Sequence, residues 1–217
     1  MLNLSADELL STTRSVRKRL DFEKPVARPL IEECLELALQ APNGSNLNTW
    51  RWILVDDSQV IAKMANIYCG GIDDFVATLG ENVGENYAGS DIPGFAAIDQ
   101  SVDHLRQNMH RSPAMLLPLM AGRMERGNAF SRGSAYGSIV QATWSFFLAL
   151  RERGLGSAWT TAHLWREKEM AELLNVPFDE YTQIGLFPIA YTIGTDFSPA
   201  YRKPVSEVAF WNTFSKG

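Results

Sequence analysis

Two arginines and a serine lie within one short segment near the N-terminus. Residues 13–17 read Thr-Arg-Ser-Val-Arg, so that Arg14 and Arg17 flank Ser15. Guanidinium and hydroxyl groups are good hydrogen-bond donors to phosphate and other anionic oxygens. Because two further basic residues follow, a charged helix end is the competing interpretation. The segment is therefore a candidate anion site that needs support from the rest of the chain.

Two other segments carry polar side chains suited to a cofactor. Residues 41–50 form a loop rich in Pro, Asn and Gly that leads into an apolar run. Asparagines in such a loop can simply shape a turn. Its candidate binding residues are Pro42, Asn43, Asn46 and Asn48. Near the C-terminus, Arg202 and Lys203 precede a proline and add two more positive charges.

In this order and spacing, the three segments resemble the motifs of the nitroreductase-like flavoproteins, which bind flavin mononucleotide (FMN). That family carries an Arg-(Arg/His)-Ser-x-(Arg/Lys) turn, then a helix, then Ala-Pro-Ser-x-x-Asn-x-Gln-Pro-Trp, and a closing Arg-Lys-Pro segment. The resemblance covers nearly the whole chain. It implies an α+β fold, a nitroreductase-like sandwich in which a small, mostly antiparallel sheet is flanked by helices, assembled as a domain-exchanged homodimer.

The resemblance also implies a role for each candidate residue. Arg14 and Ser15 would hold the FMN phosphate, which Arg202, with Lys203, would close from the C-terminal end. Arg17 would lie near N1 and O2 of the flavin, where the reduced ring gathers negative charge. The residues that would line the other face of the ring are Trp159, Thr160 and Thr161. Those that would approach from the partner subunit are Pro42, Asn43 and Asn46, with Asn48 contacting the ring.

The chain departs from the family pattern at three places. Thr13 stands where the family often has its first phosphate-binding arginine, which removes one charge from the anion site. Asn48-Thr49 replaces the usual Gln-Pro and shortens the contact to the flavin by one methylene. Asn43 replaces a common serine. None of these changes abolishes FMN binding, but each warns that the substrate can differ from that of the best-known members.

A site of this kind implies ping-pong hydride transfer from NAD(P)H to an electron-poor acceptor such as a nitroaromatic or a quinone. The flavin carries the chemistry, so no catalytic side chain and no metal ion is expected. One alternative is a specialised reductase of the same superfamily, such as a reductive dehalogenase with a zwitterion-binding lid. The sequence shows no obvious Glu-Tyr-Lys cluster for that role. The other alternative is a non-enzymatic flavin-binding or storage protein.

The elements that must position these residues alternate between helices and strands. Ser5 is a candidate N-cap for a helix over residues 6–13, and Pro29 is placed to lie in the first turn of a second helix. Apolar periodicity predicts further helices over residues 58–68, 133–153 and 167–174. Apolar runs predict strands over residues 51–55, 114–120, 155–160 and 185–193. Pro118 suggests that the second of these is an edge strand or contains a bulge. This mixed order favours an α+β sandwich.

Residues 69–98 show no regular pattern and are rich in Gly, Asn and Asp with scattered aromatic residues. Because loops of this length are often functional, the segment is a candidate lid. It would lie within a single domain that spans residues 1–217, a length ample for one core.

Composition limits the other possibilities. A net charge of −5 argues against a nucleic-acid partner, and the apolar runs are too short to span a membrane. The N-terminus lacks the features of a signal peptide. Cys34 and Cys69 do not make a disulfide framework, so a cytoplasmic location is expected. The three histidines lack metal-site spacing, and Gly154-Leu155-Gly156 follows a helix, which fits a helix cap and not a dinucleotide-binding loop.

Overall fold

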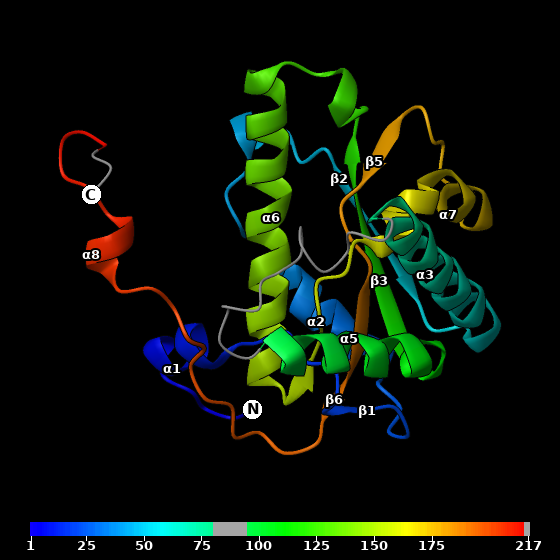
Figure 1. Ribbon diagram of the computed structural model, residues 1–217, viewed down its shortest axis with the longest axis horizontal. Coiled ribbons are helices and arrows are strands. Elements are labelled where there is room, and N and C mark those ends of the chain that lie inside the picture. Colours follow the sequence, from blue (N-terminus) through cyan, green and yellow to red (C-terminus); the bar gives the residue numbers. More distant parts are fainter. Residues whose placement is uncertain (80–94, 215–217) are drawn as a thin grey trace.

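The computed structural model describes residues 1–79 and 95–214 (Figure 1). With η denoting a 3-10 helix, the elements are, in chain order, α1 (Ala6–Thr12), β1 (Leu20–Asp21), α2 (Arg28–Ala38), η1 (Gly44–Asn46), β2 (Trp50–Val55), α3 (Ser58–Leu79), α5 (Phe95–Asn108), η4 (Met109–Arg111), β3 (Ala114–Ala121), η5 (Met124–Arg126), α6 (Ala129–Glu152), β4 (Leu155–Gly156), η6 (Ala162–Arg166), α7 (Glu167–Leu173), β5 (Tyr181–Gln183), β6 (Phe187–Thr192) and α8 (Val205–Val208).

The strands form one sheet in the order β1-β6-β3-β2, in which β4 pairs with β6 and β5 pairs with β3. Every pairing between these strands is antiparallel. Helices α2 and α6 lie on one side of the sheet, and α3 and α7 lie on the other (Figure 1). The predicted α+β sandwich, with a small antiparallel sheet flanked by helices, is confirmed.

The central strand β3 is buried on both of its faces. Because successive side chains of a strand point to opposite faces, its residues divide between two clusters. Leu116 packs with Phe146 of α6, whereas Met115 and Leu117 pack with Met64 of α3. All five side chains are fully buried. This two-sided burial explains why the strand reads as an unbroken apolar run.

The bulge predicted at Pro118 is present in the neighbouring segment: between the pairs Leu116↔Phe187 and Leu119↔Gln183, three residues of the β5–β6 segment oppose two of β3. The predicted edge position is wrong, because Pro118 lies inside β3, opposite Trp52, in a continuous register with β2. Its carbonyl accepts a hydrogen bond from the amide of Ile184 (3.1 Å), in the gap between the end of β5 and the start of β6. In an antiparallel pair the amide and carbonyl of one residue face the same neighbour. The amide hydrogen that proline lacks would therefore face this gap, and no bond to β2 is lost.

Helix α3 continues to Leu79, although the sequence predicts an end at Tyr68. Gly70 and Gly71 follow that predicted end, and glycine is normally unfavourable inside a helix. Here the missing side chain allows a close approach, because a Cβ on Gly71 would lie 2.0 Å from the carbonyl oxygen of Ala162. The first third of the candidate lid is thus helical, and its residues 80–94 lie outside the described residues.

The remaining predicted helices are present, but the bounds of some differ from those predicted. Ser5 caps α1 through a capping box, and Pro29 lies in the first turn of α2. Helix α6 begins four residues earlier than predicted, because Asn128 accepts a hydrogen bond from the amide of Ser131 and caps it there. The glycine after α6, Gly154, has a positive φ of 73°, as expected of a helix cap.

The short strands are the least well predicted. Of the predicted strand 155–160, only Leu155–Gly156 joins the sheet, because the chain then changes partners at Ser157 and Thr160. The two- and three-residue strands β1 and β5, and helix α5, were not predicted. Two or three residues are too few to display the alternation that identifies a strand.

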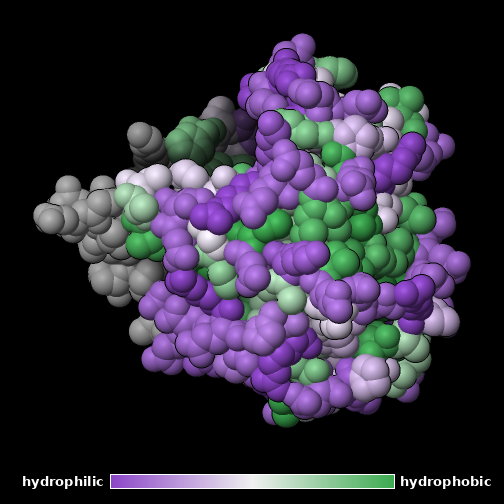
Figure 2. Space-filling view, turned by 90° about the vertical axis from the view of Figure 1, so that its right-hand side faces the viewer, coloured by the Kyte–Doolittle hydropathy of each residue, from purple (hydrophilic) through white to green (hydrophobic). Residues whose placement is uncertain are grey.

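The surface is not uniformly polar. On the side that carries α3 and α7, to the right in Figure 1, hydrophobic side chains gather between hydrophilic margins (Figure 2). Exposed apolar side chains on that side include Val76 of α3 and Trp165 of η6, whose ring makes a tilted contact with Phe75.

His163 gives the fold a predicted sensitivity to acid. It is fully buried, and neither ring nitrogen has a partner among the described residues. Burial lowers the pKa of its imidazole to about 3, below the value of about 6.5 expected in the unfolded chain. The unfolded chain therefore binds the proton more tightly, and stability is complete above about pH 6.5 and lost as the pH falls, by up to about 1.4 kcal/mol per pH unit.

Denaturant titrations between about pH 7 and about pH 5 test this expectation. His163→Leu should flatten the decline of the unfolding free energy with falling pH, whereas His110→Leu, at an exposed histidine, should leave it unchanged. Equal slopes in the wild type and in His163→Leu would contradict the assignment.

Candidate functional site

The turn that carries the two arginines is held against the segment after β4. Ser15 forms a parallel bridge with Ser157, and the amide of Val16 donates a 2.8 Å hydrogen bond to the carbonyl of Ser157. Val16 is buried beside Gly156, where an added Cβ would lie 3.0 Å from the Cβ of Val16. Close packing of the two segments thus fixes the backbone from which both guanidiniums project.

Neither arginine of this turn forms an ion pair with a described residue. Arg14 donates from Nη1 to the carbonyl of Ser198 (2.7 Å). Arg17 is half-buried, and its Nη1 lies 3.5 Å from Ser101 Oγ. Burial lowers the pKa of Arg17, against an opposing contribution from Tyr68, and raises the pKa of Tyr68 to about 12. The Tyr68 phenol is therefore neutral near pH 7, and no described residue provides a counter-ion for Arg17.

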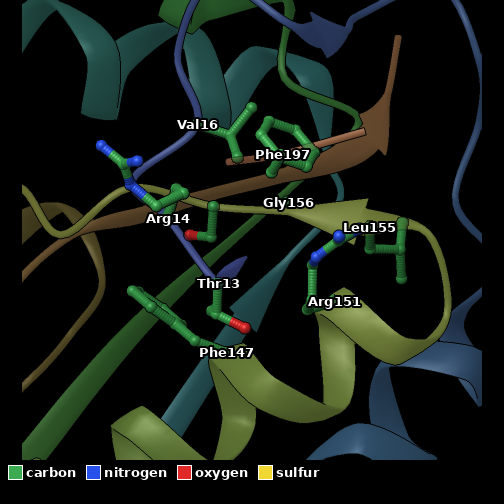
Figure 3. Close-up of a pocket in the computed structure, with 9 residues that line it drawn as sticks. Thr13, Arg14, Val16, Phe147, Arg151, Leu155, Gly156 and Phe197 are labelled. Carbon is green, nitrogen blue, oxygen red and sulfur yellow. The ribbon is translucent and has the colours of Figure 1, made fainter. Parts of the chain in front are cut away.

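A small enclosed cavity lies beside the same turn (Figure 3). Its volume is about 10 Å³, room for one water-sized group. Figure 3 shows Arg151 projecting toward it from the end of α6, and Phe197 lying beside Val16. The residues that line the cavity are Thr13, Arg14, Val16, Phe147, Arg151, Leu155, Gly156, Ser157 and Phe197.

The amide-rich loop packs against the first half of α6. The amide of Gly44 donates to Ser138 Oγ (2.9 Å), and Asn43 Oδ1 accepts from the amide of Asn48 (3.0 Å). Asn46 and Asn48 have positive φ values of 54° and 52°, a conformation that asparagine tolerates better than most residues. A pocket of about 280 Å³ lies beside this loop. Its lining residues include Asn43, Gly44, Leu47, Trp50, Met120, Phe130 and Ser138.

Within one protomer the amide-rich loop and the arginine turn do not meet. The loop contacts α6 at Ser138, whereas Arg151, which shares the cavity with Arg14, lies thirteen residues farther along the helix. At 1.5 Å per residue this is about 20 Å. Pro42 is exposed at the start of the same loop. The structure therefore separates the predicted site into two halves.

The segment that follows Ser157 belongs to the arginine half. Trp159 packs edge-on against Phe147, a cavity residue, with ring centroids 6.5 Å apart. Thr160 is buried and donates from its hydroxyl to the carbonyl of Leu186 (2.6 Å). Thr161 is exposed. Thr160 is thus committed to packing, Trp159 packs on Phe147 but stays partly accessible, and Thr161 is the most exposed of the three.

The structure does not bring Arg202 and Lys203 to this half. Both are exposed in the segment that leads to α8, which stands away from the body of the protomer (Figure 1). Arg202 donates to the carbonyl of its neighbour Tyr201 (2.7 Å). The chain passes the arginine turn earlier, at Ser198, and no hydrogen bond joins the described Arg202 or Lys203 to Arg14.

Sequence reasoning missed two polar side chains of the cavity, those of Arg151 and Ser157. A signal for the first was available, because Arg151 follows Phe147 by four residues and so falls on the buried face of a predicted helix. A charged residue at such a position rarely becomes buried without a specific partner. Ser157 gave no comparable signal.

Other site classes find no support in the described part of the chain. Residues 1–79 and 95–214 contain no group of three His, Cys, Asp or Glu side chains that could hold a metal ion. Nor does a helix in these ranges have the length and apolar character needed to cross a membrane.

Comparison with known proteins agrees with the fold. The model of the Nitroreductase family matches residues 10–191. The chain is 28% identical to iodotyrosine deiodinase of Thermotoga neapolitana over 206 residues, which are 94% of this chain and 97% of that protein.

Solved structures with the same fold include iodotyrosine deiodinase bound to FMN and 3-iodo-L-tyrosine, with a TM-score of 0.71 at 23% identity, covering 96% of this chain and 99% of that one. They also include the FMN- and NADPH-dependent nitroreductase NfnB of Sphigopyxis sp. strain HMH, with a TM-score of 0.72 at 21% identity, covering 97% of this chain and 100% of that one. Since the family match covers most of its length, this chain belongs to the nitroreductase family.

Proposed function

We propose that the protein is a cytoplasmic, FMN-dependent oxidoreductase that passes hydride from NAD(P)H to an electron-poor aromatic or quinone-like acceptor by a ping-pong mechanism. The observation that carries this proposal is the charge state of the arginine half-site. Eight arginines elsewhere are paired with a carboxylate. Six arginines have no such partner among the described residues: Arg51, Arg132 and Arg202 are exposed to solvent, whereas Arg14 and Arg17 are half-buried and Arg151 is buried. Since an unpaired buried charge is costly, a bound anion would stabilise this half-site.

The donor set fits a phosphate-bearing flavin. Arg14 and Ser15 would bind the phosphate, and Arg17 would lie at the pyrimidine edge of the ring. When bound, FMN supplies reversible hydride transfer. A fixed guanidinium at Arg17 would stabilise negative charge on the ring and so favour its reduced form. Trp159, Thr160 and Thr161 would border the opposite face.

The second half of the site would come from another copy of the chain. Pro42, Asn43, Asn46 and Asn48 lie about 20 Å from the arginine half along α6. In a twofold homodimer with α6 at the interface, the loop of one copy can reach the arginine turn of the other. We therefore infer a domain-exchanged homodimer with two shared sites.

Exposed apolar residues support this assembly. Helix α6 presents Phe130 (85% exposed), Val140 and Trp144 to solvent, on the side away from its buried residues. The C-terminal segment presents Trp211 (91% exposed) and Phe214 on an arm that stands clear of its own protomer (Figure 1). Apolar surface of this kind is typical of obligate interfaces.

The acceptor class follows from the sequence of the candidate lid. Residues 69–98 contain no lysine and no arginine, so this segment offers no cation to the carboxylate of an amino-acid substrate. We therefore favour an uncharged planar acceptor such as a nitroaromatic or a quinone. Reductive dehalogenation of an aromatic compound is a second candidate, favoured by the 28% identity to iodotyrosine deiodinase.

The protein is expected to purify yellow with non-covalent FMN. The arginine half-site suits a terminal phosphate, and the sequence has no glycine-rich loop for an adenylate. Chromatography of the acid-released flavin checks this directly. A preponderance of FAD, or no bound flavin at saturating FMN, would contradict the proposal.

Stopped-flow kinetics separate the candidate activities. The reduced protein, prepared with NADPH, is mixed anaerobically with a nitroaromatic, a quinone or 3-iodo-L-tyrosine. Rapid reoxidation by the first two supports the main proposal, and iodide release supports the second candidate. Reoxidation by oxygen alone would instead indicate flavin storage.

A further inference from the structure

We propose that Arg151 of α6 supplies a third positive charge to the FMN phosphate site, a role that rests on the proposed FMN binding. Arg151 is only 5% exposed and has no carboxylate partner among the described residues. Its Nη2 donates to the carbonyl of Thr195 (2.9 Å) and to Thr12 Oγ1 (3.3 Å). Its Nε and Nη1 are both buried, and neither has a hydrogen-bond partner in the part of the chain that the structure describes.

The surroundings of Arg151 compensate its charge only in part. The adjacent Glu152 opposes the lowering of the Arg151 pKa, but the Glu152 carboxylate accepts hydrogen bonds from the amides of Asn3 and Leu4 and not from Arg151. The Phe197 ring lies 4.9 Å from the guanidinium and adds a cation–π contact but no negative charge. The nearby Arg19 carries a like charge and is itself paired with Asp196. Burial lowers the pKa of Arg151, with Arg19 adding to this effect, yet an arginine remains charged near neutral pH. A buried cation thus lies at the site with two of its donors unused.

The cavity beside Arg151 is suited to an oxygen of an anion. Ser157, which is 4% exposed, also lines it, and its hydroxyl has no hydrogen-bond partner within residues 1–79 and 95–214. The volume of about 10 Å³ has room for an atom the size of an oxygen. The Arg151 guanidinium and the Ser157 hydroxyl therefore lie at one small cavity, which Arg14 also lines (Figure 3).

The position of Arg151 accounts for the departure from the family motif at position 13, where this chain has threonine in place of arginine. Thr13 lines the cavity with a short side chain, and its hydroxyl donates back to the carbonyl of Leu9 (2.6 Å). It therefore offers no charge to the site. Arg151 reaches the same cavity from α6 and restores the charge that an arginine at position 13 would provide.

Binding of FMN and of riboflavin to the apoprotein tests the proposal, because the two flavins differ only in the phosphate. Arg151→Met should reduce the preference for FMN over riboflavin by about tenfold or more, the scale of a lost hydrogen bond to a charged group. Riboflavin affinity should stay within about twofold of the wild type, since the ring contacts are unchanged. Arg151→Lys should keep most of the preference, and adding Thr13→Arg to Arg151→Met should restore it.

Ser157→Ala keeps the proposal testable should the Arg151 variants fail to fold. This small change should lower the preference for FMN without lowering the melting temperature, because the hydroxyl has no partner in the protomer. Unchanged preference in the Arg151 and Ser157 variants, or equal losses for the two flavins, would show that Arg151 only anchors the C-terminal segment. A wild type that binds neither flavin would overturn the proposed function together with this role.

Discussion

Replacing Arg14 with alanine is expected to weaken FMN binding by about 1.5–3 kcal/mol, which is about 10- to 150-fold. Arg14 projects from a rigid turn, lines the cavity beside Arg151, and has no carboxylate partner among the described residues. Its loss should therefore remove a charge-assisted bond to the phosphate. Quenching of flavin fluorescence during titration of the apoprotein gives the affinity. Arg28→Ala, which removes an exposed arginine paired with Asp56, is the matched control and should leave the affinity unchanged.

Arg17→Ala should behave differently from Arg14→Ala. Because its proposed neighbour is the ring and not the phosphate, its loss should lower the midpoint potential of the flavin more than it weakens binding. A redox titration beside the affinity measurement distinguishes the two roles. Equal effects on affinity and potential in both variants would show that the roles are assigned wrongly.

Deleting the residues after Glu207 is expected to abolish FMN retention and dimerisation together. The deletion removes Phe210, Trp211 and Phe214, which are exposed in the protomer and lie on an arm that stands away from it. If a partner buries these side chains, their loss should separate the subunits, split each shared site and lower the melting temperature. Size-exclusion chromatography, flavin absorbance and a thermal melt measure the three effects on one sample.

Trp165→Ala is the control for this deletion. Trp165 is also an exposed aromatic residue, but it lies on η6, next to α3, on the side opposite the arm. It should leave both the mass and the flavin content unchanged. A truncated protein that keeps its flavin, or a Trp165→Ala protein that loses its partner, would place the interface elsewhere.

Long periodic segments made much of the fold predictable. The buried face of α2, the apolar run of β3 and the capping residues Ser5 and Gly154 all carry strong local signals, and the structure confirms each of them. The motif at residues 13–17, together with the loop at 41–50, was enough to suggest the family. Signals of these kinds depend on neighbouring residues only, so a single sequence contains them.

The features that sequence reasoning missed depend on contacts between distant segments. Gly71 allows close approach to Ala162, and nothing in its own neighbourhood distinguishes that role from a helix end. Pro118 fits a central strand only because β5 and β6 leave a gap beside it. Likewise, Arg151 joins Arg14 at one cavity through the packing of α6 on the turn after α1. Contacts of this kind, between segments distant in the sequence, can be identified only in the three-dimensional structure.

The claim that the FMN site is shared between two copies is tested most directly by the mass and flavin content of the purified holoprotein. Light scattering at micromolar concentration should give twice the single-chain mass of 24.2 kDa, with one FMN for each chain. A mass of 24.2 kDa with full flavin occupancy would contradict the account, because one protomer would then hold a complete site.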